Sequence, residues 1–243
     1  MALEYTNLKE HSKWITLLLK GIPGSGKTWL CTHLKNAVII NFDNNLSGAI
    51  RKLPDEVTST LKVVNPRQKE GKTLPPSKVY DNFINILTEI GADPTIKVIV
   101  IDSLTTMAEQ LMYKITGSNT PNTKVEIQHY GDFTRYMKYF GDKVLCADDL
   151  DKHIIFTAHE QLIIDKLTDE TTYTLNMVTR MKDAFDLYFT DCWRTSVKSK
   201  LTGDPDYIIT TMPGSNFRAK CSLDLPKTFK FDDQKEAIVK AFS

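Results

Sequence analysis

The sequence predicts an α/β protein in which helices flank a mostly parallel central sheet and antiparallel strands extend it toward the C-terminus. Short apolar segments alternate with helix-like apolar stripes up to about residue 160. Shorter strand-like pieces separated by turn residues follow. The 243 residues, 41% hydrophobic and 25% charged, have the composition of one globular unit. We expect a single domain over 1–243, with a core over about 13–160, an extension over about 161–230 and a terminal helix over 231–243.

The individual elements follow from the spacing of apolar residues. Short apolar segments typical of buried strands occupy 14–20, 37–42, 61–65, 97–103 and 153–158. Apolar residues at helical spacing predict helices over 29–35, 79–90, 104–115 and 125–150. The Lys-, Pro- and Gly-rich segment 66–77 indicates a surface loop. Antiparallel strands and hairpins beside the parallel core are expected over 161–165, 171–175, 188–197 and 206–212.

Charge, cysteines and hydropathy exclude several classes of protein. The formal net charge is +1, so any nucleic-acid contact must come from a local patch. Cys31, Cys146, Cys192 and Cys221 form no C-x-x-C pair, which disfavours structural zinc and favours reduced thiols. The sequence has no signal-peptide pattern and no run of eighteen apolar residues. We expect a protein of the cytoplasm, the host cytoplasm if it is viral, without membrane contact.

The segment Gly21–Thr28, GIPGSGKT, matches the phosphate-loop pattern G-x-x-x-x-G-K-[ST]. Its glycines let the backbone curl so that N–H groups face phosphate oxygens. In this pattern Lys27 reaches the β- and γ-phosphates and the Thr28 hydroxyl holds Mg²⁺. An apolar strand precedes the loop and a helix follows it, as the motif requires. ATP and Mg²⁺ are therefore the predicted ligands, and the predicted nucleotide-binding residues are Gly21, Pro23, Gly24, Ser25, Gly26, Lys27, Thr28 and Trp29.

Asp102 is the second half expected of such a site, an acid at the end of a buried strand. It follows the apolar run VIVI. We expect it to hold Mg²⁺ through a water molecule. Taken alone, such an Asp is as consistent with a cap on the following helix. The phosphate loop upstream favours the metal role.

Ser103 follows Asp102 at a position where ATPases of the AAA+ type usually carry Glu. With the phosphate loop, the segment VIVIDSLT resembles RecA-like core ATPases, most closely the phage AAA-type proteins that serve as single-strand annealing or recombination ATPases. The resemblance extends over about Trp14–Lys230. It implies a RecA-like P-loop fold, ATP hydrolysis and a ring or filament of identical subunits. It also implies action on single-stranded DNA, with a single-strand-binding protein as a further partner.

The same resemblance implies roles for residues that follow two other strands. RecA-like proteins place Asp-x-Glu after the second strand, and the Glu positions the attacking water. Here Asn45 stands at the Glu position, and an amide orients water but cannot act as a base. Asp43 fills the role if the loop is displaced by one step. His159 stands where the family places a polar residue that senses the γ-phosphate and moves a DNA-binding loop.

Two basic regions complete the implied site. Arg218 and Lys220 resemble the cations that RecA-type oligomers insert into a neighbour's ATP site, and a strand here would place both on one face. The loop over about 165–182 corresponds to the DNA-contacting loop of the family. Its candidate contacts to phosphates and bases are Lys166, Arg180, Lys182 and Tyr173. Solvated surface cations are the alternative in both regions.

Three other functions fit parts of the pattern. A small P-loop kinase needs an acceptor pocket and usually an Arg-rich lid, and no segment is dense in Arg. A nucleotide-loaded binding module that uses ATP as an assembly switch stays open because of Asn45. A GTPase is disfavoured, since the segment Asn122–Glu126 does not match the base-reading pattern N-K-x-D.

Overall fold

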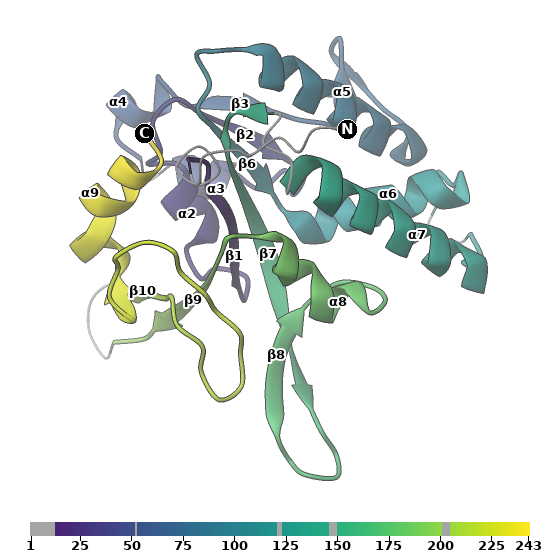
Figure 1. Cartoon of the computed structure of the whole chain (residues 1–243). Helices are drawn as coiled ribbons and strands as arrows, with labels where there is room; N and C mark the ends of the chain where they lie inside the picture. The colour runs from purple at the N-terminus through teal and green to yellow at the C-terminus, as the bar shows by residue number, and fades with distance from the viewer. Residues whose placement is uncertain (1–12, 52, 121–122, 146–149, 201–204) are drawn as a thin grey trace, which may run out of the picture.

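The computed structural model describes residues 13–51, 53–120, 123–145, 150–200 and 205–243. Within these ranges the centre of the molecule is a nine-stranded sheet (Figure 1). Its strands run in the order β11–β10–β9–β1–β7–β6–β2–β3, and β8 pairs with β7. The pairs from β9 to β3 are parallel, whereas β8, β10 and β11 pair antiparallel. The predicted fold class is confirmed.

The strands form where β-branched and other apolar residues run together. The parallel strands are β1 Thr16–Gly21, β2 Ala37–Asn41, β3 Lys62–Val64, β6 Val98–Asp102, β7 His153–Ile164 and β9 Asp191–Lys198. The antiparallel strands are β8 Thr171–Leu175, β10 Asp206–Thr210 and β11 Thr228–Lys230. Strands β1, β2 and β6 are buried along their whole length, which explains their continuous apolar sequences.

Helices cover both faces of the sheet. The long ones are α5 Pro76–Ala92, α6 Leu104–Thr116, α7 Ile127–Phe140 and α9 Phe231–Ala241. The short ones are α2 Lys27–Cys31, α3 Ser47–Ile50, α4 Asp55–Thr58, α8 Met181–Ala184, the 3-10 turn η3 Phe185–Tyr188 and the π-helical turn η1 Gly141–Leu145. Helices α5, α6 and α7 lie together on one face, and α2 and α9 lie on the other (Figure 1). The described helices are too short or too polar to cross a lipid bilayer.

Strand β1 separates two apolar cores. Leu18 belongs to the cluster under α5, α6 and α7, whereas Leu17 and Leu19 belong to the cluster under α2 and α9. This alternation follows from the two-residue period of a strand. β1 lies between β7 and β9, so the loop that follows Gly21 emerges from the middle of the sheet.

Two strand predictions beyond residue 153 were wrong in detail. The segments 153–158 and 161–165 form one strand, β7, because no turn residue separates them. Strand β9 was expected to be antiparallel, but it pairs in parallel with β1. β8 runs antiparallel to β7, and after α8 and η3 the chain enters β9 in the direction of β7 and β1. The segment after residue 161 therefore contributes to the same sheet as the predicted core.

Three further expectations need adjustment. The predicted loop 66–77 contains a small hairpin, β4 Gln68–Lys69 with β5 Lys72–Thr73, and ends in the first turn of α5. The helix expected over 125–150 begins at Ile127 and widens into the π-helical turn η1. Residues 146–149 at its predicted end, with Cys146, lie outside the described residues. Helix α2 is shorter than the predicted 29–35.

Candidate functional site

The phosphate loop leaves the carboxyl end of β1 in a curled conformation. Gly24 and Gly26 have φ angles of 77° and 88°, which favour glycine because other residues meet steric strain there. Gly21 is needed for a different reason: a Cβ at this position would lie 2.4 Å from the Thr195 carbonyl oxygen. Ser25 donates a hydrogen bond to the Ile22 carbonyl at 2.7 Å. The glycines predicted from the motif are therefore required by the loop geometry.

Lys27 is held inside this loop by backbone oxygens. Its ammonium group donates to the carbonyls of Gly21 and Ile22, both at 2.9 Å, and the residue is 6% exposed. Burial lowers the pKa of Lys27 to about 8, and the negative charges of Asp102, Glu160 and Asp43 oppose this shift. A triphosphate offers the ammonium group stronger acceptors than these carbonyls.

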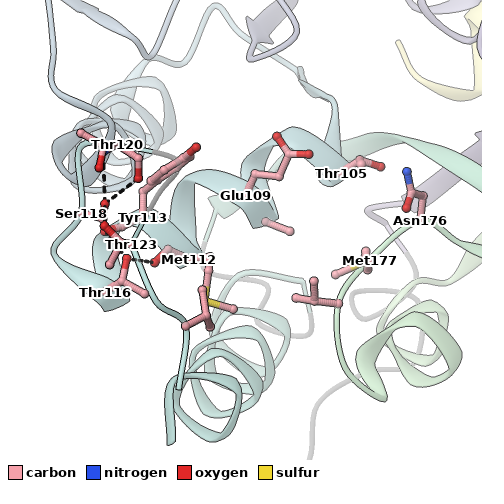
Figure 2. A pocket seen from close by; sticks show the side chains of 13 residues that line it. Thr105, Glu109, Met112, Tyr113, Thr116, Ser118, Thr120, Thr123, Asn176 and Met177 are labelled. Atoms are coloured by element: carbon pink, nitrogen blue, oxygen red, sulfur yellow. Dashed lines mark hydrogen bonds between the residues drawn. The ribbon is translucent and has the colours of Figure 1, made fainter. Parts of the chain in front are cut away.

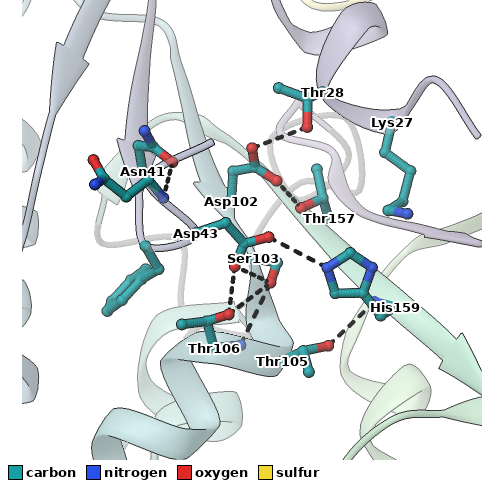
Figure 3. Close-up of polar contacts among 12 residues, drawn as sticks. Lys27, Thr28, Asn41, Asp43, Asp102, Ser103, Thr105, Thr106, Thr157 and His159 are labelled. Atoms are coloured by element: carbon teal, nitrogen blue, oxygen red, sulfur yellow. Dashed lines mark hydrogen bonds and ion pairs between the residues drawn. The ribbon is translucent and has the colours of Figure 1, made fainter. Parts of the chain in front are cut away.

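Thr28 and Asp102 lie side by side, as the motif predicts. The Thr28 hydroxyl donates to Asp102 Oδ2 at 3.0 Å, and the Thr157 hydroxyl donates to Oδ1 of the same carboxylate (Figure 3). Burial raises the pKa of Asp102, and Asp43 adds to this, against the two hydroxyl hydrogen bonds. A hydroxyl and a carboxylate at the mouth of a phosphate loop are the hard oxygen ligands that Mg²⁺ prefers. The residues fit the predicted metal.

Asp43, rather than Asn45, is the centre of the polar network beside this pair. Its carboxylate accepts hydrogen bonds from Ser103 at 2.8 Å and from Thr106, and it lies 3.3 Å from His159 Nε2 (Figure 3). Burial acts to raise the pKa of Asp43, but the hydrogen bonds from His159, Thr106 and Ser103 outweigh it and leave the pKa below its ordinary value. Asn45 lines the same cavity.

His159 connects the site to two other parts of the chain. Its Nδ1 is buried without a hydrogen-bond partner among the described residues, so this ring nitrogen is available to a ligand. Its backbone N–H donates to the Thr105 hydroxyl at 3.1 Å, and its carbonyl accepts from the Asn176 N–H at 2.8 Å. Thr105 and Asn176 both line a second cavity of about 360 Å³ beside α6 (Figure 2). These hydrogen bonds join His159 to α6 and to the chain after β8.

These residues surround one cavity of about 620 Å³ at the carboxyl edge of the sheet. Among the predicted residues, the following line it: Pro23, Gly24, Ser25, Gly26, Lys27, Thr28, Trp29, Asp43, Asn45, Asp102 and His159. Pro205, Tyr207 and Asp232 close its outer side and were not foreseen. Tyr207 packs against Gly26, where a Cβ would lie 2.8 Å from its ring. Gly48 and Ala49 of α3 also line the cavity and were not predicted. No local pattern marks Tyr207, because it meets the loop only through the pairing of β10 with β9.

Comparison with known proteins assigns the chain to a protein family. Residues 13–223 match the family AAA_24, described as an AAA domain. The chain belongs to this family. As an AAA-type P-loop ATPase it uses ATP and Mg²⁺, the ligands that the site residues fit. No curated protein sequence matches the chain.

Solved structures similar to this AAA domain protein have low sequence identity to it. A KaiC-like protein of Pyrococcus horikoshii is 11% identical, with 89% of this chain and 84% of that chain covered and a TM-score of 0.47. The flagellar accessory protein FlaH of Methanocaldococcus jannaschii is 13% identical over 89% and 84%, with a TM-score of 0.40. An ATPase of a type III secretion system from pathogenic bacteria is 12% identical over 75% and 52%, with a TM-score of 0.43.

Arg218 and Lys220 lie outside the nucleotide cavity of their own chain. The strand expected through them is wrong: the segment is irregular, and Lys220 makes only an isolated bridge to Cys192. Arg218 donates to the Asp183 carbonyl at 2.7 Å and lies 3.7 Å from Asp186. Its side chain is 67% exposed, so it faces the surface rather than the cavity. Their role in a neighbour's site stays a prediction.

The predicted DNA-contacting residues lie on and after the β7–β8 hairpin. Lys166 is exposed at its tip, and Arg180 is exposed before α8. Tyr173, the predicted stacking ring, is half-buried, and the Arg194 guanidinium covers its face at 3.9 Å. Lys182 is half-buried beside a further cavity behind β8.

Proposed function

We propose that the chain is a Mg²⁺-dependent ATPase that acts on single-stranded DNA as a homo-oligomer, in phage-type recombination, annealing or replication in the cytoplasm. The observation that carries the proposal is the position of His159. Its ring lies beside Asp43 in the nucleotide cavity, and its strand continues without a break into the β7–β8 hairpin. The β-strand β7 therefore joins the ATP site to the projecting β7–β8 hairpin.

Each side chain of the site has a separate role in the proposed hydrolysis. Asp43, held by Ser103 and Thr106, orients a water molecule toward the γ-phosphate. The water oxygen forms the new P–O bond, the bond to the β-phosphate oxygen breaks to release ADP, and the proton of the water passes to an oxygen of the phosphate formed. Lys27 offsets the negative charge that develops on the phosphate oxygens. The metal, held by Thr28 and Asp102, supplies further charge neutralisation when bound.

The lowered pKa of Asp43 favours positioning over proton abstraction. A carboxylate with a pKa below its ordinary value is a weak base, but it stays ionised and accepts a hydrogen bond from water. His159 Nε2 lies 3.3 Å from the same carboxylate, and a γ-phosphate competes with Asp43 for an N–H at this position. Loss of the Asp43–His159 contact on ATP binding then moves β7.

The hairpin itself supports contact with a nucleic acid or another subunit. It extends away from the body of the molecule (Figure 1). Its strands carry the exposed residues Leu162 and Ile164, and its tip carries Lys166 and Leu167, the latter 95% exposed. Exposed cations track phosphates, and exposed apolar groups pack against bases or a neighbouring chain.

The test is ATP turnover with and without an oligothymidine single strand, together with the particle mass by light scattering. We expect Mg²⁺-dependent turnover that the single strand raises several-fold, and a larger mass with ATP. The variant Lys27→Ala, which removes the phosphate-binding ammonium group, serves as the inactive control. Binding without turnover under either condition would favour an ATP-switched module, and phosphate transfer to a small acceptor would favour a kinase.

A further inference from the structure

Lys20 is a buried lysine that the ATP site does not use. It lies in β1, directly before the first residue of the phosphate loop, and is 4% exposed. The described residues provide no hydrogen-bond or ion-pair partner for its ammonium group. Glu160, a buried acid of the adjacent strand β7, is bonded to Arg194 at 2.8 Å. An ammonium group without a protein partner needs water or an anionic ligand as its hydrogen-bond acceptor.

Lys20 lines a cavity of about 340 Å³ behind β8 that is separate from the nucleotide cavity. Its register partners are Ala158 and Arg194, so it points to the face of the sheet that carries Leu18. Two more polar atoms of the cavity wall, Thr174 Oγ1 and Asp186 Oδ1, are buried without a hydrogen-bond partner among the described residues. Polar groups without a hydrogen-bond partner on a cavity wall mark the cavity as a site for a polar ligand.

The charges around the cavity favour an anion. Lys20 and Lys182 contribute two ammonium groups without a hydrogen-bond or ion-pair partner in the described part of the chain, and Thr174 contributes a hydroxyl donor. Two acids, Asp183 and Asp186, also line the cavity. Arg218 lies 3.7 Å from Asp186 Oδ1, and together with the two lysines it gives three cations against two carboxylates. The wall is fixed in place, because the Tyr173 N–H donates to the Asn216 carbonyl at 2.8 Å and joins β8 to the loop before Arg218.

We propose that this cavity binds a phosphate group of single-stranded DNA, with Lys20 as its central ligand and Lys182 at its rim. The inference rests on the proposed action on single-stranded DNA, since the cavity lies against β8 of the hairpin assigned to that role. It adds a functional consequence: Lys20 directly precedes Gly21, whose carbonyl holds Lys27. Lys20 of β1 would thus bind the DNA phosphate, and the phosphate loop that follows β1 would bind the ATP phosphates.

The test measures the affinity of ATP-saturated protein for a fluorescent oligothymidine over a series of salt concentrations. In Lys20→Met, we expect an affinity about tenfold lower and a salt slope smaller by about 0.7, the loss of one single-strand phosphate contact. Lys182→Ala should show a smaller loss in the same direction. The matched control Lys35→Met removes an exposed lysine near α9 and should leave both quantities unchanged.

A second measurement separates this site from loss of folding and from the proposed function. The melting temperature of Lys20→Met should equal or exceed that of the wild type, because an unpaired buried charge is removed. If the wild type binds no oligothymidine, the DNA role is overturned, and inorganic phosphate is the remaining probe. A phosphate-dependent rise in melting temperature that Lys20→Met lacks would identify free phosphate as the ligand. Equal DNA affinity, salt slope and phosphate response in the two proteins would overturn the site.

Discussion

Lys20 and Lys27 stand on either side of the start of the phosphate loop, and both are almost fully buried. Their surroundings differ. The ammonium group of Lys27 has two carbonyl partners at 2.9 Å and lies in the field of Asp102 and Asp43. The ammonium group of Lys20 has no partner in the described part of the chain. Lys27 therefore has hydrogen-bond partners before a ligand binds, whereas Lys20 gains one only from its ligand.

The difference follows from how each lysine is positioned. The left-handed glycines of the loop bring backbone carbonyls around Lys27, so a short sequence motif carries its own partners. Lys20 is fixed by strand pairing between β7 and β9, and the surrounding wall comes from β8 and the loop before Arg218. A preorganised site loses little entropy on binding, whereas an unpaired charge in a cavity reduces stability until the ligand binds.

The largest expected effect tests whether the face around Arg218 serves a neighbour's nucleotide. If Arg218 enters an adjacent ATP site, Arg218→Ala should lower turnover by about 10³-fold with nearly unchanged ATP affinity, because a trans cation stabilises charge in the transition state. Mixing Arg218→Ala with Lys27→Ala subunits should restore part of the turnover, since each supplies what the other lacks. Lys220→Ala is tested in the same way.

The outcome of mixing decides between two uses of this face. Recovery of turnover in the mixture places Arg218 in a shared site. Unchanged turnover of the single variant would show that its contacts with Asp183 and Asp186 are structural. The Lys20 cavity would then stand as a site within one subunit.

The next largest effect tests whether Asp43 or Asn45 positions the attacking water in the nucleotide cavity. Asp43→Asn should lower turnover by about 10²-fold or more, because a neutral amide accepts a weaker hydrogen bond from the attacking water. Asn45→Ala is the matched control and should change turnover by less than about threefold, since Asn45 has no part in the Asp43–His159 contact. Single-turnover kinetics at saturating ATP measure both. The reverse ranking would return the water-positioning role to Asn45.

The sequence predicted the parts of the site that local chain geometry determines. The phosphate loop follows β1, Asp102 ends β6, and His159 lies in β7 opposite Gly21, at the edge where the carboxyl ends of the parallel strands meet. Thr157 escaped notice although it lies two residues before His159 on the same strand, because a single Thr carries no distinctive pattern.

The parts that long-range pairing determines were not predictable in this way. The direction of β9 depends on the path through α8 and η3, and short apolar runs look alike in parallel and antiparallel pairs. Tyr207 reaches Gly26 only because β10 pairs with β9. Lys20 looked like an ordinary strand-ending lysine, and its burial appears only once β7 and β9 cover both sides of β1.

The smallest expected effect is a pH dependence specific to Lys27. Its pKa of about 8 describes the protein without nucleotide, and bound phosphates favour the charged form and raise that pKa. Below pH 8 the ammonium group is charged in both states, so this group does not change ATP affinity. Above pH 8 the free protein loses the proton and must regain it on binding, so affinity falls by at most about tenfold per pH unit.

Calorimetry in two buffers of different ionisation enthalpy measures this proton uptake directly. We expect uptake that approaches one proton per ATP near pH 9 and vanishes near pH 6.5, because only the deprotonated form of Lys27 must gain a proton. Lys20→Met should retain the uptake, since Lys20 lies outside the nucleotide cavity. An uptake that is absent at pH 9 would show that the carbonyls of Gly21 and Ile22 keep Lys27 charged despite its burial. The two lysines would then differ only in their partners.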